Sequence, residues 1–542
     1  MTGRRRPIST TSAPGGVTRR ALLGTAALGG AALAGAPLAR AAMRPSSPKE
    51  GAYVPQPNPT QYVIAVGRTS INPDGTQSVP AVLGNGTLPG PEIRVHEGDL
   101  LRVLVENRLP DSATSIHWHG LLDPAAMDGV PDVSNAPIAP GRMYIYEYPI
   151  RQTGTYWYHS HVGFQEQEGF SGAFIIEPRH EPLRTEHDAV VLLGDWLHRS
   201  PEEVFAELRG GKPPMGAAKD GGTNGETKGA VDAGAAKPGG MNPSGQPGSM
   251  NMKPEAAQPS GMKPGATPPG GMNMNGGADL SDVKYDAFLM NGRGGSSDPW
   301  TLSVRPGERV RLRIIDGGAS TYFRVALDGH KLQVTHADGM AVEPVTVDHL
   351  LIGMGETYDA VVKITAAGSY TLHAVAMDGS GQALGVIHTP GVAPQPNRDM
   401  PTFTGRALSY ADLRAPAVTT LPEGPSRTFR LPLQGDMARY IWMIDGQAWP
   451  KADPLLIRRG DRVQIELVNE TGMWHPMHLH GHFFRVLQGA GDRCPLKHTA
   501  NVAPKETLKI EFTADNPGKW FFHCHNVYHL EAGMAREFVY TT

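Results

Sequence analysis

Alternating apolar and polar positions recur in short stretches along the chain, for example at QYVIAVG (61–67), MYIYEYPI (143–150) and SYTLHAVA (369–376). These stretches are rich in β-branched and aromatic residues, and turn-forming residues such as Gly, Pro and Asn separate them. A period of two is typical of strands that bury one face. The 66 glycines and 48 prolines predict many turns and little helix. The pattern therefore predicts an all-β protein.

An internal repeat divides the predicted strands into three sets. IRVHEGDLLRVLVEN, LSVRPGERVRLRIID and LIRRGDRVQIELVNE begin near residues 93, 302 and 456. In each copy a strand meets a Gly beside an acid, and an alternating strand follows that ends in Asn or Asp. Copies this far apart predict three domains, each a β-sandwich or barrel with Greek-key connections. We expect these domains at 53–180, 187–392 and 400–542.

A segment of different composition interrupts the second predicted domain at 210–278. It consists mainly of Gly, Pro, Ala, Lys and Met, and it cannot bury enough apolar surface to fold. A flexible linker is one interpretation, but thioethers are soft ligands that select Cu(I). We therefore expect this disordered insertion to handle Cu(I). Seven of the chain's 21 methionines lie in it: Met215, Met241, Met250, Met252, Met262, Met272 and Met274.

The first 42 residues are typical of a twin-arginine export signal. A basic stretch ends in TRRALL with Arg19 and Arg20 paired, an apolar segment follows, and ARA at 39–41 offers a cleavage site. A membrane anchor is the alternative, but the apolar segment contains four glycines and a proline. We therefore predict an exported protein, extracellular, in the cell wall or periplasmic, without a membrane span once the signal is removed.

Charge and cysteine content narrow the possible classes of protein. The formal net charge is −3, and the first 42 residues hold six arginines and no acid. The remaining body is mildly acidic, which gives no reason to expect nucleic-acid binding. With Cys494 and Cys524 alone, at most one disulfide can form. If Cys524 binds a metal, Cys494 is unpaired and the fold relies on its apolar cores.

Four H-x-H pairs are the strongest chemical signal in the chain. In a strand, residues i and i+2 point to the same face, so each pair can present two imidazoles to one place. A single pair is often polar surface, whereas four pairs among 21 histidines predict a shared metal centre between the first and third domains. Three coppers with two, three and three histidines would use all eight, although imidazole also suits zinc and iron. The pairs are His117 with His119, His159 with His161, His478 with His480, and His523 with His525.

Cys524 favours copper. It lies between His523 and His525 and on a strand would point to the opposite face, so a second site must lie there. A thiolate, two imidazoles from His475 and His529 and a weak axial thioether from Met534 make a blue-copper set, although a buried structural cysteine is the alternative. The main chain at Cys524 would join both sites. Single electrons could then pass to a cluster that reduces O₂ to water, and the protons required predict a nearby carboxylate.

These motifs resemble the three-domain multicopper oxidases, the family of laccases and bacterial copper oxidases. The resemblance covers about residues 60–542 and rests on HWHG, YHSH, HPMHLHGH and HCHNVYHLEAGM. It implies three cupredoxin-like domains and four copper ions, one type 1, one type 2 and two type 3. His482 is not a ligand in the family pattern, and we expect it to pack or to form hydrogen bonds. The implied ligands are His475, Cys524, His529 and axial Met534 for type 1, His117 and His478 for type 2, and His119, His159, His161, His480, His523 and His525 for type 3.

The resemblance also bears on proton supply and potential. Asp128, in AMDGVPDV, matches an acid of the family near the cluster, and we expect it to relay protons rather than serve only as a turn residue. Many bacterial members carry a Glu just before the last type 1 histidine, where this chain has Tyr528. The axial Met implies a lower or middle potential than the Leu or Phe of high-potential fungal laccases.

The implied activity is oxidation of a donor, one electron at a time, coupled to four-electron reduction of O₂ to water. The Met-rich insertion and the export signal favour Cu(I) as the donor in copper tolerance, with phenol oxidation as a side capacity. The alternative is a laccase dedicated to phenols or lignin fragments. A copper-free binding protein of the same fold is disfavoured because the ligand set is complete, and a two-domain nitrite reductase because there are three repeats. We expect a monomer.

Overall fold

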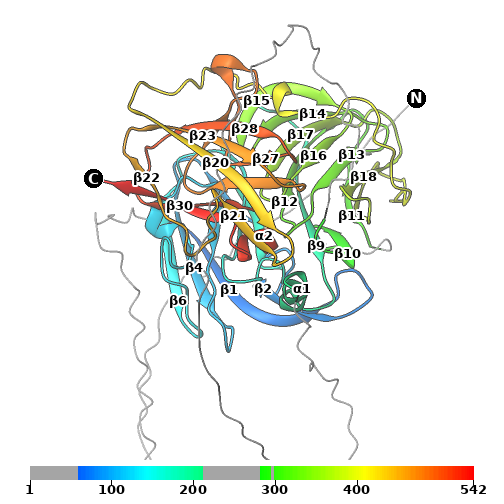
Figure 1. The fold of residues 1–542 in the computed structure, drawn as a ribbon. Coiled ribbons are helices and arrows are strands. Elements are labelled where there is room, and N and C mark those ends of the chain that lie inside the picture. The colour runs from blue at the N-terminus through cyan, green and yellow to red at the C-terminus, as the bar shows by residue number, and fades with distance from the viewer. Residues whose placement is uncertain (1–58, 211–280, 295–297) are drawn as a thin grey trace, which may run out of the picture. The chain divides into compact units, whose positions relative to one another are not determined.

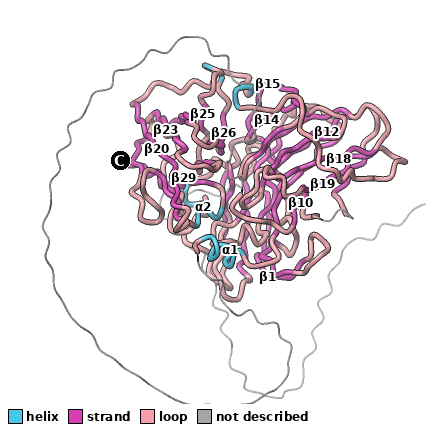
Figure 2. Tube along the Cα trace, turned by 45° about the vertical axis from the view of Figure 1, so that its right-hand side comes forward, coloured by secondary structure: helices cyan, strands magenta, loops and turns pink. Residues whose placement is uncertain are grey.

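The structure is a computed structural model that describes residues 59–210, 281–294 and 298–542. The predicted export signal (1–42) and the seven methionines of the predicted insertion, Met215 to Met274, lie outside these residues. Strands dominate the described part of the chain, which contains two short α-helices (Figures 1 and 2). The predicted all-β class and the predicted scarcity of helix are therefore confirmed.

Six sheets form three pairs, and each pair takes its strands from one stretch of chain. We call these pairs the first, second and third domains. The first has sheet orders β2-β1-β4-β6 and β3-β8-β7-β5, with β1 Thr60–Ile71, β2 Val79–Gly84, β3 Ile93–His96, β4 Leu100–Asn107, β5 His117–His119, β6 Met143–Pro149, β7 Gly154–His159 and β8 Ser171–Glu177. The second has orders β10-β9-β12-β17-β14-β15 and β11-β19-β18-β13-β16, with β9 His187–Trp196, β10 Ala287–Met290, β11 Trp300–Ser303, β12 Arg309–Asp316, β13 Phe323–Leu327, β14 Leu332–Ala337, β15 Met340–Val347, β16 Leu350–Ile352, β17 Thr357–Lys363, β18 Ser369–Ala376 and β19 Gln382–His388.

The third domain repeats this plan and ends the chain. Successive strands change sheets repeatedly in all three domains, which is the predicted Greek-key arrangement. Its sheet orders are β21-β20-β23-β28-β25-β26 and β22-β30-β29-β24-β27, with β20 Ser426–Asp436, β21 Ile441–Ile444, β22 Leu455–Arg458, β23 Arg462–Asn469, β24 His475–Leu479, β25 Phe484–Val486, β26 Leu496–Lys497, β27 Thr499–Val502, β28 Thr507–Thr513, β29 Lys519–Cys524 and β30 Ala535–Thr541.

The predicted repeat corresponds to the same structural step in each domain. A short strand (β3, β11 or β22) lies in one sheet, and the long strand after it (β4, β12 or β23) lies in the other. The turn between them contains Gly98, Gly307 or Gly460, with φ of 82°, 96° and 87°. Residues that carry a side chain rarely adopt a positive φ, which explains why each of these turns contains glycine. The repeated G-D or G-E motif therefore marks the point where the chain passes from one sheet to the other.

Strand register brings the histidine pairs together. In the first domain β5 pairs with β7 so that His117 lies opposite His159. In the third domain β24 pairs with β29 so that His478 lies opposite His523. The four pairs thus come from two neighbouring strands in each of two domains and from the residues just beyond their ends, because His161, His480 and His525 follow β7, β24 and β29.

The helices are short, and one of them helps to place a predicted ligand. α1 (Pro201–Leu208) begins after Ser200, and α2 (Val527–Glu531) begins after Asn526, whose side chain accepts the N–H groups of Tyr528 and His529. This cap holds the start of the turn that carries His529. Over the described residues, no helix has the length and apolar character needed to cross a membrane. Three single turns of 3₁₀-helix lie at Ala125–Met127, Tyr410–Asp412 and Gly491–Arg493.

Candidate metal centre

The eight histidines of the four H-x-H pairs lie together in the interior, between the first and third domains; we call them the histidine cluster. Three sets place their ring nitrogens within 4.8 Å of one another: His119, His159 and His525; His117, His161 and His480; and His117, His119 and His478. His523 completes the group, because its Nε2 lies 3.0 Å from Nε2 of His480. All eight predicted side chains therefore meet at one place.

Ring nitrogens within the histidine cluster lack the hydrogen-bond partners that buried polar groups normally have. Nε2 of His117, His159, His161 and His478 and Nδ1 of His119 are buried with no partner among the described residues, as are both ring nitrogens of His525. Buried polar atoms are nearly always bonded, so an unpartnered set facing one point is a signature of metal ligands. This donor set fits copper, for which imidazole is a common ligand.

The protonation state of the histidine cluster also suits a metal. Burial lowers the pKa of His523 to about 3. Burial, and then repulsion from neighbouring imidazoles, holds the pKa of His119 and that of His478 well below the usual range. These imidazoles are therefore neutral near neutral pH, and a neutral ring nitrogen is the form that binds a metal.

Cys524 forms a second group, which we call the cysteine site, with His475 and His529. Its Sγ lies 3.6 Å from Nδ1 of His475 and 3.5 Å from Nδ1 of His529, and all three residues are buried. Burial raises the pKa of the Cys524 thiol well above its usual range, so formation of the thiolate requires a nearby cation. Met534 is fully buried, and its main-chain oxygen accepts the N–H of Cys524 at 3.0 Å. Cys494 is buried and unpaired.

The two groups lie on opposite sides of one strand end. Cys524 belongs to the cysteine site, whereas its neighbours His523 and His525 belong to the histidine cluster. The main chain from Cys524 to either histidine is therefore a direct covalent link between the two groups. This follows from the alternation of side chains along a strand.

Asp128 lies beside the histidine cluster, where a carboxylate was predicted. It is 1% exposed, and Nδ1 of His480 lies 3.1 Å from each of its carboxylate oxygens. Its main-chain oxygen accepts the Nδ1 hydrogen of His117 at 2.9 Å. Asp128 therefore leaves the Nε2 atoms of both rings free to face the cluster.

Two further carboxylates contact predicted ligands, and the sequence patterns do not identify them. Oε2 of Glu166 lies 2.7 Å from Nδ1 of His159, and Oδ2 of Asp282 lies 2.9 Å from Nε2 of His529. Glu166 follows the HSH pair in a loop with the sequence FQEQEG, and Asp282 lies at the start of the described range 281–294. The acid-rich loop directly after HSH is the one sequence signal that could have indicated Glu166.

Tyr528 and His482 are placed by hydrogen bonds. Tyr528 occupies the position where many bacterial relatives were expected to carry Glu, and its hydroxyl donates to Oε1 of Gln167 at 3.3 Å. His482 donates from Nδ1 to the main-chain oxygen of His480 at 3.0 Å, and its Nε2 lies 2.7 Å from the Tyr540 hydroxyl. His482 thus forms hydrogen bonds beside the histidine cluster, as expected.

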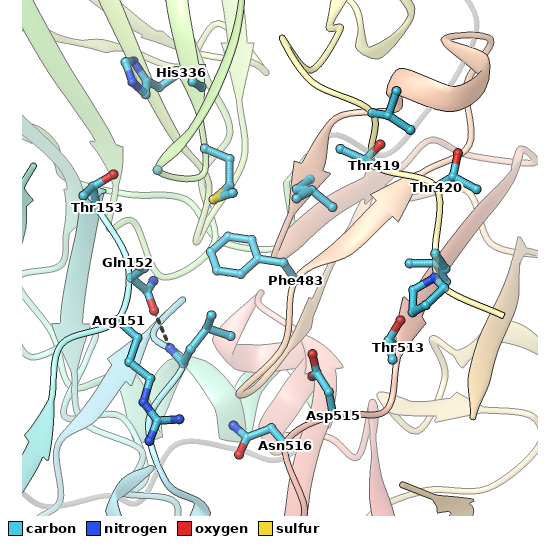
Figure 3. Close-up of a pocket in the computed structure, with 18 of the residues that line it drawn as sticks. Arg151, Gln152, Thr153, His336, Thr419, Thr420, Phe483, Thr513, Asp515 and Asn516 are labelled. Atoms are coloured by element: carbon cyan, nitrogen blue, oxygen red, sulfur yellow. Dashed lines mark hydrogen bonds between the residues drawn. The ribbon is translucent and has the colours of Figure 1, made fainter. Parts of the chain in front are cut away.

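A cavity of about 720 Å³ lies near the histidine cluster, and its lining comes from all three domains (Figure 3). Gln152 of the first domain, His336 of the second and Phe483 of the third line it. The Phe483 ring lies 5.7 Å from the ring of His498, which lies 4.8 Å from that of His119. The rings of Phe483 and His498 therefore lie in succession between this cavity and His119 of the cluster.

Comparisons with known proteins agree with this geometry. Sequence profiles described as multicopper oxidase match residues 65–181, 263–391 and 424–542. A copper resistance protein A homolog of Pseudomonas syringae pv. tomato is 33% identical, over 88% of this chain and 92% of its own length. The multicopper oxidase MmcO of Mycobacterium tuberculosis is 34% identical, over 86% of this chain and 84% of its own length. The crystal structure of a laccase from Botrytis aclada matches with a TM-score of 0.67 and 26% identity, over 89% of this chain and 87% of that one.

The chain belongs to the multicopper oxidase family. It is an oxidoreductase with copper cofactors and O₂ as electron acceptor. The family also confirms the predicted cupredoxin-like fold of the three domains.

Proposed function

We propose that this multicopper oxidase oxidises Cu(I) outside the cytoplasm as part of copper tolerance, with phenols as secondary donors. The observation that carries the proposal is the shared strand end, where Cys524 belongs to the cysteine site and His523 and His525 to the histidine cluster. Relatives named for copper resistance support the choice of donor. The Met-rich composition of 210–278 supports it independently, because thioethers select Cu(I).

The proposal includes four copper ions and assigns a role to each group of ligands. His475, Cys524, His529 and Met534 would hold the type 1 ion. His117 and His478 would hold the type 2 ion, and the other six histidines of the cluster the type 3 pair. When bound, these ions supply one-electron uptake from the donor and four-electron reduction of O₂ to water. The predicted domain limits and the twin-arginine route of export remain part of the proposal.

The chain's own residues provide orientation and protons. Asp128 and the main chain around it hold His117 and His480 with Nδ1 protonated. The carboxylate of Asp128 is the proposed group for proton delivery beside the histidine cluster, where four protons are needed for each O₂. All proposed ligands are buried except His161, which is partly buried, and this burial keeps bulk water away from most of the centre.

Copper analysis and absorption spectroscopy test the assignment. The purified protein should bind four copper ions per chain and show a copper–thiolate band at about 600 nm that Cys524→Ser abolishes. Survival of the blue band in that variant would disprove the type 1 assignment. Deletion of 210–278 should reduce Cu(I) turnover and leave phenol turnover unchanged.

A laccase dedicated to phenols is the second candidate. Its support is the match to laccases, among them laccase-2 of Botryotinia fuckeliana at 27% identity over 88% of this chain. The deletion experiment separates the two candidates. Equal Cu(I) turnover with and without 210–278 would favour the phenol-specific enzyme.

A further inference from the structure

The second domain supplies none of the predicted metal ligands, yet one of its hairpin turns lies against the other two domains. Asp338 and Gly339 join β14 to β15, with φ of 48° and 75°. A Cβ added to Gly339 would lie 2.3 Å from the Tyr156 ring, and one added to Gly154 would lie 2.4 Å from the main-chain oxygen of Gly339. The close approach to the first domain therefore requires glycine at both positions.

On its other side the same turn holds the third domain through Asp338. Oδ2 of Asp338 accepts the main-chain N–H of His498 at 3.1 Å and that of Thr499 at 3.0 Å. Oδ1 accepts the N–H of Thr357 at 3.0 Å and lies 3.0 Å from Nζ of Lys497. Asp338 is fully buried, so each of these bonds is shielded from water.

The peptide that Asp338 holds is in turn bonded to two predicted ligands. The main-chain oxygen of His498 lies 2.8 Å from Nδ1 of His478. A carbonyl oxygen can only accept, so this Nδ1 carries the hydrogen and Nε2 carries the lone pair. The hydroxyl of Thr499 lies 3.1 Å from the same Nδ1 and 3.2 Å from Nε2 of His119. These contacts leave Nε2 of His478 and Nδ1 of His119 as the unpartnered nitrogens.

Lys497 keeps the carboxylate of Asp338 charged in this buried position. Its Nζ lies 3.0 Å from Asp338 and 3.0 Å from Oε1 of Glu356. Burial alone would lower the pKa of Lys497, but these two carboxylates outweigh burial and raise it. Burial alone would raise the pKa of Asp338, but interactions with His498 and Lys497 and the main-chain N–H groups of Thr357 and Thr499 outweigh burial and lower this pKa. An ionised carboxylate is the stronger acceptor for the two N–H groups.

We propose that Asp338 is a positioning residue of the metal centre. Through the His498–Thr499 peptide it orients His478 and His119, so that His478 turns Nε2 and His119 turns Nδ1 toward the metal ions. The inference rests on the proposed function and gives the ligand-free second domain a role in it. Hydrogen-bond partners that fix ligand histidines typically change metal affinity about 10- to 100-fold when removed.

The first test is Asp338→Asn, which keeps the size of the side chain and removes its charge. We expect its histidine cluster to lose copper to a chelator at concentrations about 10- to 100-fold lower than in the wild type. The blue band of the cysteine site should persist, and the EPR spectrum of the remaining type 2 copper should change. Asp359→Asn is the matched control, because Asp359 is also buried in the second domain but bonds Thr155 and Arg311. It should lower stability and leave copper content and EPR spectrum unchanged.

A second pair of variants covers the case in which Asp338→Asn does not fold. Thr499→Val removes the hydroxyl at constant shape, whereas Thr499→Ser keeps it. Thr499→Val should lose copper from the histidine cluster, and Thr499→Ser should retain it. The inference is overturned if folded Asp338→Asn has wild-type copper affinity and EPR spectrum, if Asp359→Asn loses copper equally, or if the two Thr499 variants behave alike. A wild-type chain that binds no copper would instead contradict the proposed function itself.

Discussion

Nδ1 of His480 lies 3.1 Å from both carboxylate oxygens of Asp128, a residue 352 positions earlier in the chain. The same Asp128 accepts the Nδ1 hydrogen of His117 through its main-chain oxygen. One buried residue of the first domain therefore orients an imidazole from its own domain and another from the third. Any change at Asp128 acts on both domains at once.

Asp128→Asn should lower O₂ consumption about 10- to 100-fold while leaving the blue band unchanged. An amide can still contact His480, but it cannot take up and release a proton as a carboxylate can. An oxygen electrode and an absorption spectrum of the same sample measure both effects. Asp132→Asn is the control, because Asp132 is exposed in the same loop. Wild-type O₂ consumption by Asp128→Asn would rule out the proposed proton delivery.

Asp282→Asn should slow donor oxidation and shift the midpoint potential of the blue site. Asp282 contacts Nε2 of His529 at 2.9 Å and accepts the hydroxyl of Tyr440. Burial alone would raise the pKa of Asp282, but the hydrogen bond and charge of His529 and the Tyr440 hydroxyl outweigh it and lower it. The carboxylate therefore stays ionised and supports His529 to pH values below the ordinary range for aspartate. We expect a loss in kcat/KM of about tenfold.

A redox titration of the blue band, together with steady-state kinetics, measures the effect of Asp282→Asn. Asp286→Asn removes an exposed carboxylate four residues away and should match the wild type in both. Equal midpoint potentials and rates for Asp282→Asn and Asp286→Asn would show that the contact between Asp282 and His529 affects neither the potential of the blue site nor donor oxidation.

Cys494→Ser should retain the blue band and full activity, in contrast to Cys524→Ser. The Cys494 thiol is buried and donates to the main-chain oxygen of Gly491 at 3.2 Å. A serine hydroxyl can make the same bond, so the change in the free energy of unfolding should be about 1 kcal/mol or less. Thermal unfolding and the absorption spectrum check both points. Loss of colour in Cys494→Ser would mean that this thiol contributes to the copper site.

The buried carboxylate of Asp359 predicts that the free energy of unfolding decreases at low pH. Burial alone would raise its pKa, but Arg311, Arg313 and the nearby His336 outweigh burial and lower it to about 2. A lowered folded-state pKa means that this stabilisation is complete above the unfolded value of about 3.8 and is lost as the pH falls through 2. The contribution is about 2 kcal/mol.

Urea unfolding of the wild type and of Asp359→Asn between pH 2 and 6 measures this contribution. The difference in unfolding free energy should be constant above about pH 4 and shrink toward pH 2. A difference that grows toward low pH would have the wrong sign and would refute the assignment.

The fold and most of the candidate site follow from local patterns. A period of two identifies strands, and the same period predicts that both histidines of an H-x-H pair share a face. The opposite orientation of Cys524 follows from the same rule. These are short-range properties, so a single sequence contains them.

The partners of the ligands do not follow in this way. Glu166 and Asp282 lie in loops, and their contacts with His159 and His529 depend on how distant segments pack. Asp338 is a turn residue in an ordinary D-G hairpin, and its contact with the His498–Thr499 peptide spans 160 residues. No periodicity in the sequence indicates such contacts, because they depend on how the domains pack against one another.

The ligands of the histidine cluster are divided between residues 117–161 and 478–525, on either side of the entire second domain. During synthesis, a ribosome that has completed two domains has made only half of these imidazoles. A nascent or C-terminally truncated chain can therefore present isolated histidine pairs but no complete centre. Assembly of the complete metal site therefore cannot precede synthesis of the third domain, and full copper occupancy of the histidine cluster indicates that translation and domain docking have both finished.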